Sequence, residues 1–142
     1  MSAFLIDTNV VSEFSRRGEP DPRVKSWLKA AAPGSLYASV LTLAEIRRGI
    51  EMLPASKRRS QLEQWLEGEL LESFGTNLLP VTRAIGDRWA VLSARAQKRG
   101  APLAVIDGLI AATALEHDLV LATRNVRDFL DLGVSIFNPW EP

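Results

Sequence analysis

The stretch FLIDTN, residues 4–9, places a carboxylate, a hydroxyl and an amide directly after a continuously apolar run. An apolar run without polar alternation is typical of a strand that is buried on both faces, so residues 4–6 predict an interior strand of a parallel sheet. Asp7 then stands where this strand ends. An unpaired carboxylate in such a place costs roughly several kcal/mol, so Asp7 needs hydrogen-bond donors, a basic side chain or a metal ion as its partner.

The chain of 142 residues has the size of one domain, and we expect residues 1–142 to form a single domain. Its composition, 46% apolar and 24% charged residues, is that of an ordinary soluble protein. No segment approaches the roughly 20 apolar residues of a membrane span, so no membrane partner is expected. The short first apolar run without a preceding basic residue argues against export, and the lack of cysteine fits a reducing compartment, so a cytoplasmic location is expected.

The charge balance is neutral, with 17 basic and 17 acidic residues, which argues against a nucleic acid held by bulk charge. Local basic clusters nevertheless occur at residues 16–17, 47–48, 57–59 and 98–99, and the segment 63–72 is acidic. Solvated helix faces explain such clusters as well as a binding surface does. The charge pattern therefore neither supports nor excludes a nucleic-acid partner.

Strand-like and helix-like segments alternate along the rest of the chain. Asp21 followed by Pro22 predicts a helix start, the segment 42–45 has the pattern of a capping box, and Thr82 predicts another N-cap. Such alternation predicts an α/β protein with a mainly parallel central sheet and helices on both faces, a three-layer α/β/α fold. The expected strands are residues 4–6, 36–40, 77–81, 119–123 and 134–137, and the expected helices are about 22–32, 42–52, 62–75, 82–100, 104–117 and 125–130.

Acidic residues fall where these strands end or where the following helices begin. Asp7 follows the first strand, Glu45 lies in the expected first turn after the second strand, and Asp107 lies in the first turn of the helix 104–117. Because the carboxyl ends of parallel strands meet at one edge of a sheet, these acids are expected to lie together there. Carboxylates repel one another unless a cation lies between them, and oxygen ligands without His or Cys select Mg²⁺ or Mn²⁺. The sequence therefore predicts a divalent-metal site.

Each acid also has a purely structural explanation. The helix dipole stabilises an acid in a first turn, and Glu45 is placed to complete a capping box with Thr42. Asp107 interrupts an apolar stretch, where capping alone would more usually draw Ser or Thr. The single histidine, His117, lies at a helix end on the opposite edge and is expected to be structural. Only the convergence of three acids on one edge favours a chemical role.

Four motifs occur in order along the chain: IDTN at 6–9, TLAEI at 42–46 with Gly49, DGLIAATA at 107–114, and ATRN at 122–125 followed by DF at 128–129. Together they resemble the PIN-domain family, and more narrowly the VapC and FitB type of toxin ribonuclease from type II toxin-antitoxin pairs. The resemblance implies a Mg²⁺-dependent endoribonuclease that hydrolyses RNA through metal-activated water, with Mn²⁺ as a substitute. It also implies a homodimer, a cognate antitoxin whose segment occupies the active-site groove, and Asp7, Glu45 and Asp107 as metal-binding catalytic residues.

The fourth site position departs from the relatives that have an acid there, because Asn125 occupies it. Asn ligates a hard cation through its carbonyl oxygen or binds a metal-bound water, but Asn125 is equally suited to cap the short helix after it. We expect Asn125 and Thr123 to orient water or a ligand, and Asp128 to support them. Thr8 and Asn9, next to Asp7, are expected to be further supporting residues.

A two-component receiver module is the main rival, because it is also a small doubly wound domain with acids at strand ends. It would need an acidic pair after the first strand and a Lys near the last strands, whereas Thr8 and Asn9 follow Asp7 and no Lys follows Lys98. An aspartyl-phosphate phosphatase would need a second Asp where Asn9 stands. The alternative function is thus a catalytically inactive interaction module, either PIN-like or receiver-like.

Overall fold

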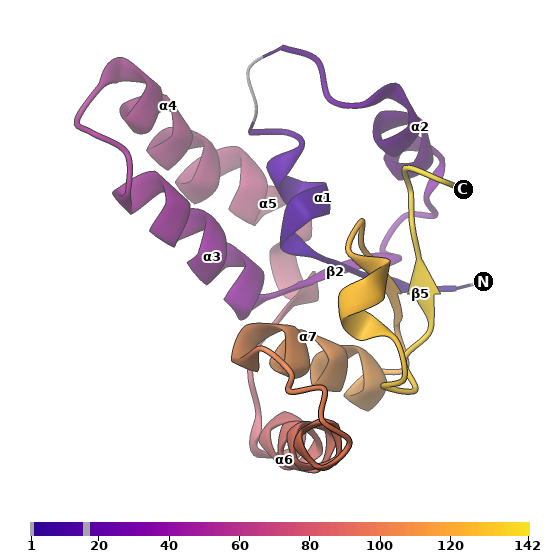
Figure 1. The fold of residues 1–142 in the computed structure, drawn as a ribbon. Coiled ribbons are helices and arrows are strands. Elements are labelled where there is room, and N and C mark those ends of the chain that lie inside the picture. Colours follow the sequence, from indigo (N-terminus) through magenta and orange to yellow (C-terminus); the bar gives the residue numbers. More distant parts are fainter. Residues whose placement is uncertain (1, 16–17) are drawn as a thin grey trace.

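Five strands form one parallel sheet in the computed structural model, which describes residues 2–15 and 18–142 (Figure 1). The order across the sheet is β3-β2-β1-β4-β5, and each neighbouring pair is parallel. The expected fold class is confirmed, although the strands are short. They are β1 (Phe4–Ile6), β2 (Leu36–Ser39), β3 (Leu78–Leu79), β4 (Val120–Ala122) and β5 (Ile136–Phe137).

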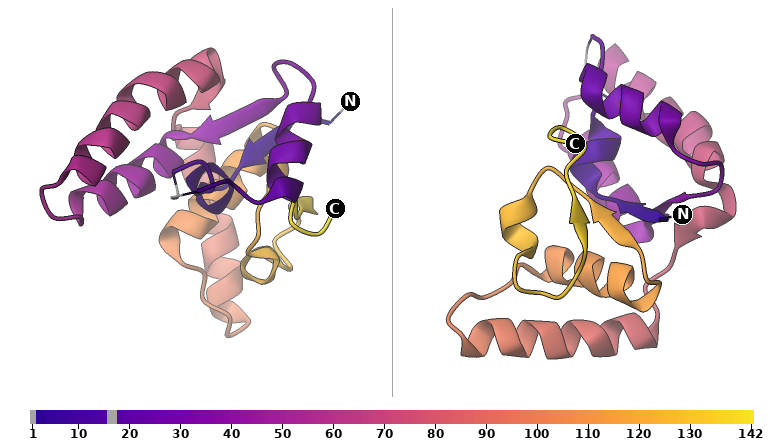
Figure 2. Two further views of the ribbon diagram at one scale, coloured as in Figure 1. Left: turned by 90° about the horizontal axis from the view of Figure 1, so that it is seen from above. Right: turned by 90° about the vertical axis from the view of Figure 1, so that its right-hand side faces the viewer.

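Helices cover both faces of this sheet. On one face lie α1 (Thr8–Ser12), α2 (Pro22–Ala30), α3 (Val40–Glu51), and a continuous run of α4 (Lys57–Trp65), the π-helical turn η1 (Leu66–Leu70) and α5 (Leu71–Phe74). On the other face lies α7 (Val105–Glu116), with α6 (Arg83–Lys98) as the outermost layer beyond it (Figure 2, right). Two 3-10 helices, η2 (Gly75–Asn77) and η3 (Val126–Phe129), complete the described elements. Within the described residues, no helix is long and apolar enough to cross a membrane.

Neighbouring residues of β1 face two separate hydrophobic cores. Leu5 is fully buried in the core under α7, together with Leu121 of β4. Ile6 packs into the core on the opposite face, which α1, α2, α3 and η1 enclose. Because both faces of the central strands are covered, residues 4–6 are continuously apolar, as the sequence pattern indicated.

The helix α7 is buried on nearly all sides, because it lies between the sheet and α6. Its buried residues are Gly108, Ile110, Ala111, Ala112, Thr113 and Ala114. At Gly108 the two helices meet closely: a Cβ atom there would lie 2.8 Å from Trp89 Cδ1 and 2.9 Å from Leu103 Cδ2. The glycine therefore allows the α6 indole to pack directly on the α7 backbone.

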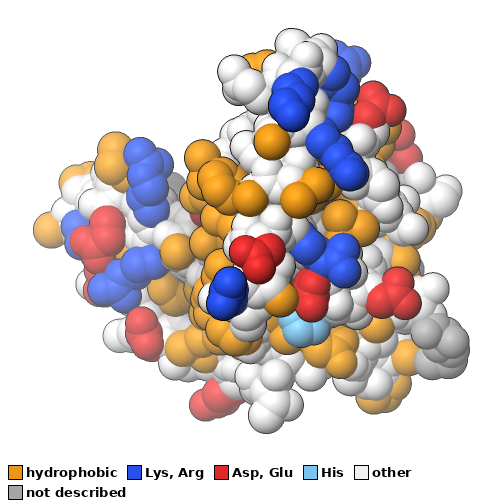
Figure 3. All heavy atoms as spheres, turned by 90° about the horizontal axis from the view of Figure 1, so that it is seen from below, with side chains coloured by type: hydrophobic (Ala, Val, Ile, Leu, Met, Phe, Trp, Pro, Cys, Tyr) orange, Lys and Arg blue, Asp and Glu red, His pale blue; other side chains and the backbone are white. Residues whose placement is uncertain are grey.

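The outer surface of α6 carries charges of both signs. Viewed from below, Lys and Arg side chains are scattered among Asp, Glu and hydrophobic ones (Figure 3). Arg83 and Asp87 lie 3.9 Å apart on exposed positions of α6, and Arg88 pairs with Glu116 of α7 at 2.5 Å. These pairs are those of a solvated helix face. The basic pair at residues 16–17 lies outside the described residues.

The helix after β2 begins earlier than we predicted. Ser39 ends the strand and caps α3, because its Oγ accepts a hydrogen bond from the Leu41 N–H at 3.0 Å. This serine satisfies the first amides of the helix before Thr42 is reached, so the predicted capping box is wrong. Thr42 is fully buried inside α3, and Glu45 lies in its second turn.

Gly108→Ala should destabilise the fold, because its Cβ has to displace Trp89 and Leu103. Overpacking of this kind costs about 1–3 kcal/mol, and each kcal/mol lowers the Tm by about 2–4 °C. Thermal unfolding followed by circular dichroism measures the change. Gly49→Ala is the matched control: it lies in α3, a Cβ there meets no atom within 4 Å, and about 0.5–1 kcal/mol of added stability is expected. Stabilisation by both substitutions would contradict the tight α6–α7 contact.

Candidate active site

The expected acids gather at the carboxyl ends of β1 and β4, which are neighbours in the middle of the sheet. The strand order reverses between these two strands, and parallel α/β sheets open a crevice at such a point. Asp7 follows β1 and Thr123 follows β4, while α3 carries Glu45 and α7 carries Asp107. Four segments that are distant in the sequence therefore contribute to one location.

Asp7 is only 6% exposed and is the N-cap of α1, a short helix that the sequence analysis did not predict. Its Oδ1 accepts a hydrogen bond from the Thr8 N–H at 2.8 Å. Its Oδ2 accepts one from the Thr123 hydroxyl at 2.8 Å, and Asn9 Nδ2 lies 3.4 Å from the same oxygen. The partners of this buried carboxylate in the described structure are therefore neutral hydrogen-bond donors.

Thr123 connects the ends of the two strands. Its side chain is fully buried, and its Oγ1, besides donating to Asp7, accepts hydrogen bonds from Asn9 Nδ2 at 3.2 Å and from the Asn125 N–H at 3.0 Å. Asn9 Oδ1 in turn accepts a hydrogen bond from the Arg124 N–H at 3.1 Å. This network places Asn9 and Thr123 beside Asp7, where the sequence analysis expected supporting residues.

Glu45 reaches this location from the second turn of α3. Its Oε1 accepts a hydrogen bond from the Thr8 hydroxyl, and Thr42 Oγ1 lies 3.5 Å from Thr8 Oγ1. Because Glu45 completes no capping box, its structural explanation from the sequence no longer holds. Thr42, which the sequence pattern indicated only as a helix cap, also belongs to this group of side chains. Ser39 was the signal that could have revealed it, because a cap at Ser39 places Thr42 inside the helix. Thr42 and Glu45, three residues apart, then lie on the same side of the helix.

Asp107 lies half-buried in the first turn of α7, and its surroundings disfavour its ionised form. Burial raises the pKa of Asp107 to about 6, and the charges of Asp7, Asp128 and Glu45 contribute in the same direction. Burial also raises the pKa of Asp7, which the hydrogen bonds from Thr123 and Thr8 oppose. Asp7, Glu45, Asp107 and Asp128, which we call the acid group, therefore share one electrostatic environment.

The two residues considered for the fourth position lie differently. Asn125 precedes η3, but its side chain makes no capping hydrogen bond, so the alternative explanation of Asn125 as a side-chain cap is wrong. Its N–H donates to Thr123 instead. Asp128 lies in the first turn of η3, lines a surface hollow together with Asp107, and contributes to the raised pKa of both Asp7 and Asp107. The geometry thus adds a fourth carboxylate to the site, and the catalytic role of Asn125 stays a prediction.

The donors gathered here are oxygen atoms of carboxylates, hydroxyls and an amide, which are the ligands that Mg²⁺ and Mn²⁺ prefer. The chemistry of this donor set therefore fits a hard divalent cation. Across residues 2–15 and 18–142, no three His, Asp or Glu side chains are already arranged as a metal cluster. Asp7 is hydrogen-bonded to Thr123 and Glu45 to Thr8. The ion and its ligands stay predictions.

Known proteins match this chain along nearly its whole length. The family model for the PIN domain matches residues 4–134. The VapC ribonuclease Y4jK of Sinorhizobium fredii is 41% identical over 138 residues, which cover 97% of this chain and 98% of that protein. The toxin FitB of Neisseria gonorrhoeae is 38% identical over 136 residues, which cover 96% of this chain and 97% of that protein.

Solved structures agree with these matches. The crystal structure of FitAcB from Neisseria gonorrhoeae superposes with a TM-score of 0.90 at 37% identity, covering 98% of this chain and 99% of that chain. Further matching structures come from toxin-antitoxin systems. The match in three dimensions therefore extends over the same part of the chain as the match in sequence.

Asp107→Asn should stabilise the metal-free fold at pH 7. Since the pKa of Asp107 is raised from 3.8 to about 6, the folded protein holds this proton more tightly than the unfolded chain does. Wild-type stability therefore falls as the pH rises from 3.8 to 6, and the variant avoids this loss. With solvent screening taken into account, we expect Asp107→Asn to raise the free energy of unfolding by about 1 kcal/mol at pH 7 and by almost nothing at about pH 4.

Calorimetric unfolding in chelator at the two pH values measures this difference. Asp87→Asn, at an exposed position of α6, is the control and should change stability by less than about 0.5 kcal/mol at either pH. A gain for Asp107→Asn that does not depend on pH would contradict the raised pKa.

Proposed function

Because this chain belongs to the PIN-domain family and matches VapC and FitB toxins along nearly its whole length, we propose that it is a toxin with Mg²⁺-dependent endoribonuclease activity. We propose further that residues 1–142 form one nuclease domain, and that it acts on RNA in the cytoplasm as a homodimer. The observation that carries the proposal is the acid group at the point where the strand order reverses. A group of like charges in a crevice lowers stability and is typical of a functional site.

The residues of this site have separate tasks in phosphodiester hydrolysis. Asp7, Glu45 and Asp107 are the proposed ligands of Mg²⁺ or Mn²⁺, and the bound ion would neutralise phosphate charge and activate a water. Thr123 orients Asp7 through its hydroxyl, and Thr8 orients Glu45 in the same way. Because these hydroxyls belong to the turn after β1 and to the end of β4, the sheet itself determines where the two carboxylates lie.

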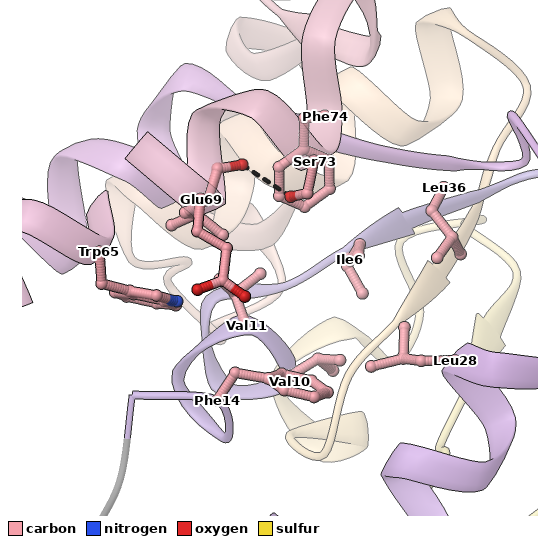
Figure 4. Close-up of a pocket in the computed structure, with 11 residues that line it drawn as sticks. Ile6, Val10, Val11, Phe14, Leu28, Leu36, Trp65, Glu69, Ser73 and Phe74 are labelled. Atoms are coloured by element: carbon pink, nitrogen blue, oxygen red, sulfur yellow. Dashed lines mark hydrogen bonds between the residues drawn. The ribbon is translucent and has the colours of Figure 1, made fainter. Parts of the chain in front are cut away.

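An apolar pocket of about 260 Å³ lies near this site, between α1, α2 and the α4–α5 run (Figure 4). Val10, Val11 and Phe14 face Trp65 across it, and Glu69 and Ser73 supply polar groups at its side. Trp65 also lines a neighbouring groove that contains Thr8 and Glu45. Apolar surface therefore continues from the pocket to the acid group.

We propose that this pocket receives an apolar segment of a cognate antitoxin. The resemblance to structures from toxin-antitoxin systems supports such a partner. Phe14 supports the location, because 43% of this large apolar side chain is exposed at the pocket. A segment bound there and continuing along the groove would reach Glu45.

In cleavage assays, the wild-type protein should cut single-stranded RNA with Mg²⁺ or Mn²⁺ and should stop in excess chelator. Asp7→Asn and Glu45→Gln should each lower kcat by at least about a hundredfold, because each removes a proposed metal ligand. Glu72→Gln, on α5, is the matched control and should cleave at the wild-type rate. Full activity in chelator would disprove metal dependence. Equal rates for Glu45→Gln and Glu72→Gln would remove Glu45 from the site. If Asp7→Asn also cleaved at the wild-type rate, an interaction module would be favoured over a nuclease.

Expression of this protein alone should arrest bacterial growth, whereas expression of Asp7→Asn should not. Co-expression of the small protein encoded by the neighbouring gene should restore growth, if that protein is the antitoxin. Phe14→Ala should weaken this rescue, because it removes apolar surface from the pocket. Met52→Ala, at a position that is 72% exposed and outside the pocket, should be rescued normally. Equal growth with wild-type protein and Asp7→Asn would contradict toxicity.

A further inference from the structure

A second hollow, of about 430 Å³, begins at the acid group and leads away along the α6–α7 connection. Asp107 and Asp128 form its inner end, and the other lining residues come from the segments 99–104 and 127–132. Its volume falls within the range of about 300–1,000 Å³ that is usual for small-ligand sites. A group bound in this hollow would therefore lie directly beside the proposed reaction centre.

Two arginines, Arg99 and Arg127, line this hollow. Arg23, Arg47, Arg59 and Arg88 each form an ion pair with a carboxylate. Arg99 and Arg127 are exposed and line the hollow, and within residues 2–15 and 18–142 neither side chain forms an ion pair or a hydrogen bond. Their guanidinium groups are therefore available to an anion that enters the hollow.

The remaining wall of the hollow is apolar except for Asp131, a third carboxylate that lines it. Leu103 and Leu130 line it, and Leu130 is 52% exposed, which is unusual for a large apolar side chain. A base has an apolar face and a phosphate has a negative charge, so a nucleotide matches a wall of this kind next to two arginines. An apolar peptide segment would leave the two arginines without a partner, and the pocket between α1 and α5 suits such a segment better because its lining is mainly apolar.

We propose that this hollow binds the RNA nucleotide next to the scissile phosphate, with Arg99 and Arg127 on its phosphates and Leu130 against its base. The inference rests on the proposed nuclease function and names the side chains that position its substrate. Because these contacts are the same before and during the reaction, they act on KM and leave kcat nearly unchanged. Arg99 and Arg127 are thus positioning residues, distinct from the acid group.

The test compares Arg99→Gln, Arg127→Gln and the double variant on a fluorescein-labelled single-stranded RNA. Each single substitution should raise KM about tenfold, because it removes one charge-assisted contact. Binding of the same RNA, measured by anisotropy in an Asp7→Asn background, should lose about 0.7 from the slope of log Kd against log salt for each arginine removed. Leu130→Ala should raise KM without changing that slope, since its contact carries no charge.

Arg83→Gln is the matched control, because it removes the same charge from a 95% exposed position at the opposite end of α6. The inference is overturned if Arg83→Gln raises KM as much as Arg127→Gln does, or if the wild-type protein cleaves RNA and the hollow variants keep its KM. It is also overturned if the substitutions weaken only the binding of an antitoxin. If the wild-type protein cleaves no RNA but binds it through Arg99 and Arg127, the proposed nuclease function fails and the nucleotide site stands.

Discussion

The hydrogen bond from the Thr123 hydroxyl to the Asp7 carboxylate joins the two strands between which the sheet order reverses. Both side chains are buried, so loss of this donor would leave Asp7 Oδ2 with only the longer contact from Asn9 Nδ2 at 3.4 Å. The same hydroxyl also accepts hydrogen bonds from Asn9 and from the N–H of Asn125. One threonine therefore positions the turn after β1, the turn after β4 and the carboxylate between them.

The carboxylates of the acid group repel one another and so lower the stability of the fold at neutral pH, although they are the side chains that suit the site to metal binding. Asp107 lies at the start of the most buried helix, where both burial and three neighbouring carboxylates raise its pKa. The surrounding structure compensates with a close α6–α7 contact at Gly108 and with two hydrophobic cores, one on each face of the sheet. A rigid scaffold of this kind can hold like charges together at one edge.

Two surface depressions lie on different sides of this acid group: the hollow contains Asp107 and Asp128, and the apolar pocket connects to Glu45 through the neighbouring groove. The apolar pocket belongs to α1, α2 and the α4–α5 run, whereas the hollow with Arg99 and Arg127 belongs to the α6–α7 connection and to the turn after η3. Their chemistry differs in the same way, because the first is lined mainly by apolar side chains and the second combines two arginines with leucines and acids. The proposed antitoxin segment and the proposed RNA nucleotide would therefore contact separate sets of side chains.

The sequence by itself determined the fold class, the position of β1 and the placement of Asp7 and Asp107 at one edge, because hydrophobic periodicity and the parallel-sheet rule are local or nearly local signals. It did not determine where α3 begins, since Ser39 and Thr42 are both good caps. In the structure the strand ends at Ser39, and Thr42 is buried with its Oγ1 3.5 Å from Thr8 Oγ1. The short helix α1, the missing side-chain cap at Asn125 and the hollow between residues 99–104 and 127–132 were likewise decided by tertiary structure. The hollow joins segments that are distant in the chain, and α1 buries Val10 and Val11 in a core shared with α2, α3 and η1. No local pattern encodes such contacts.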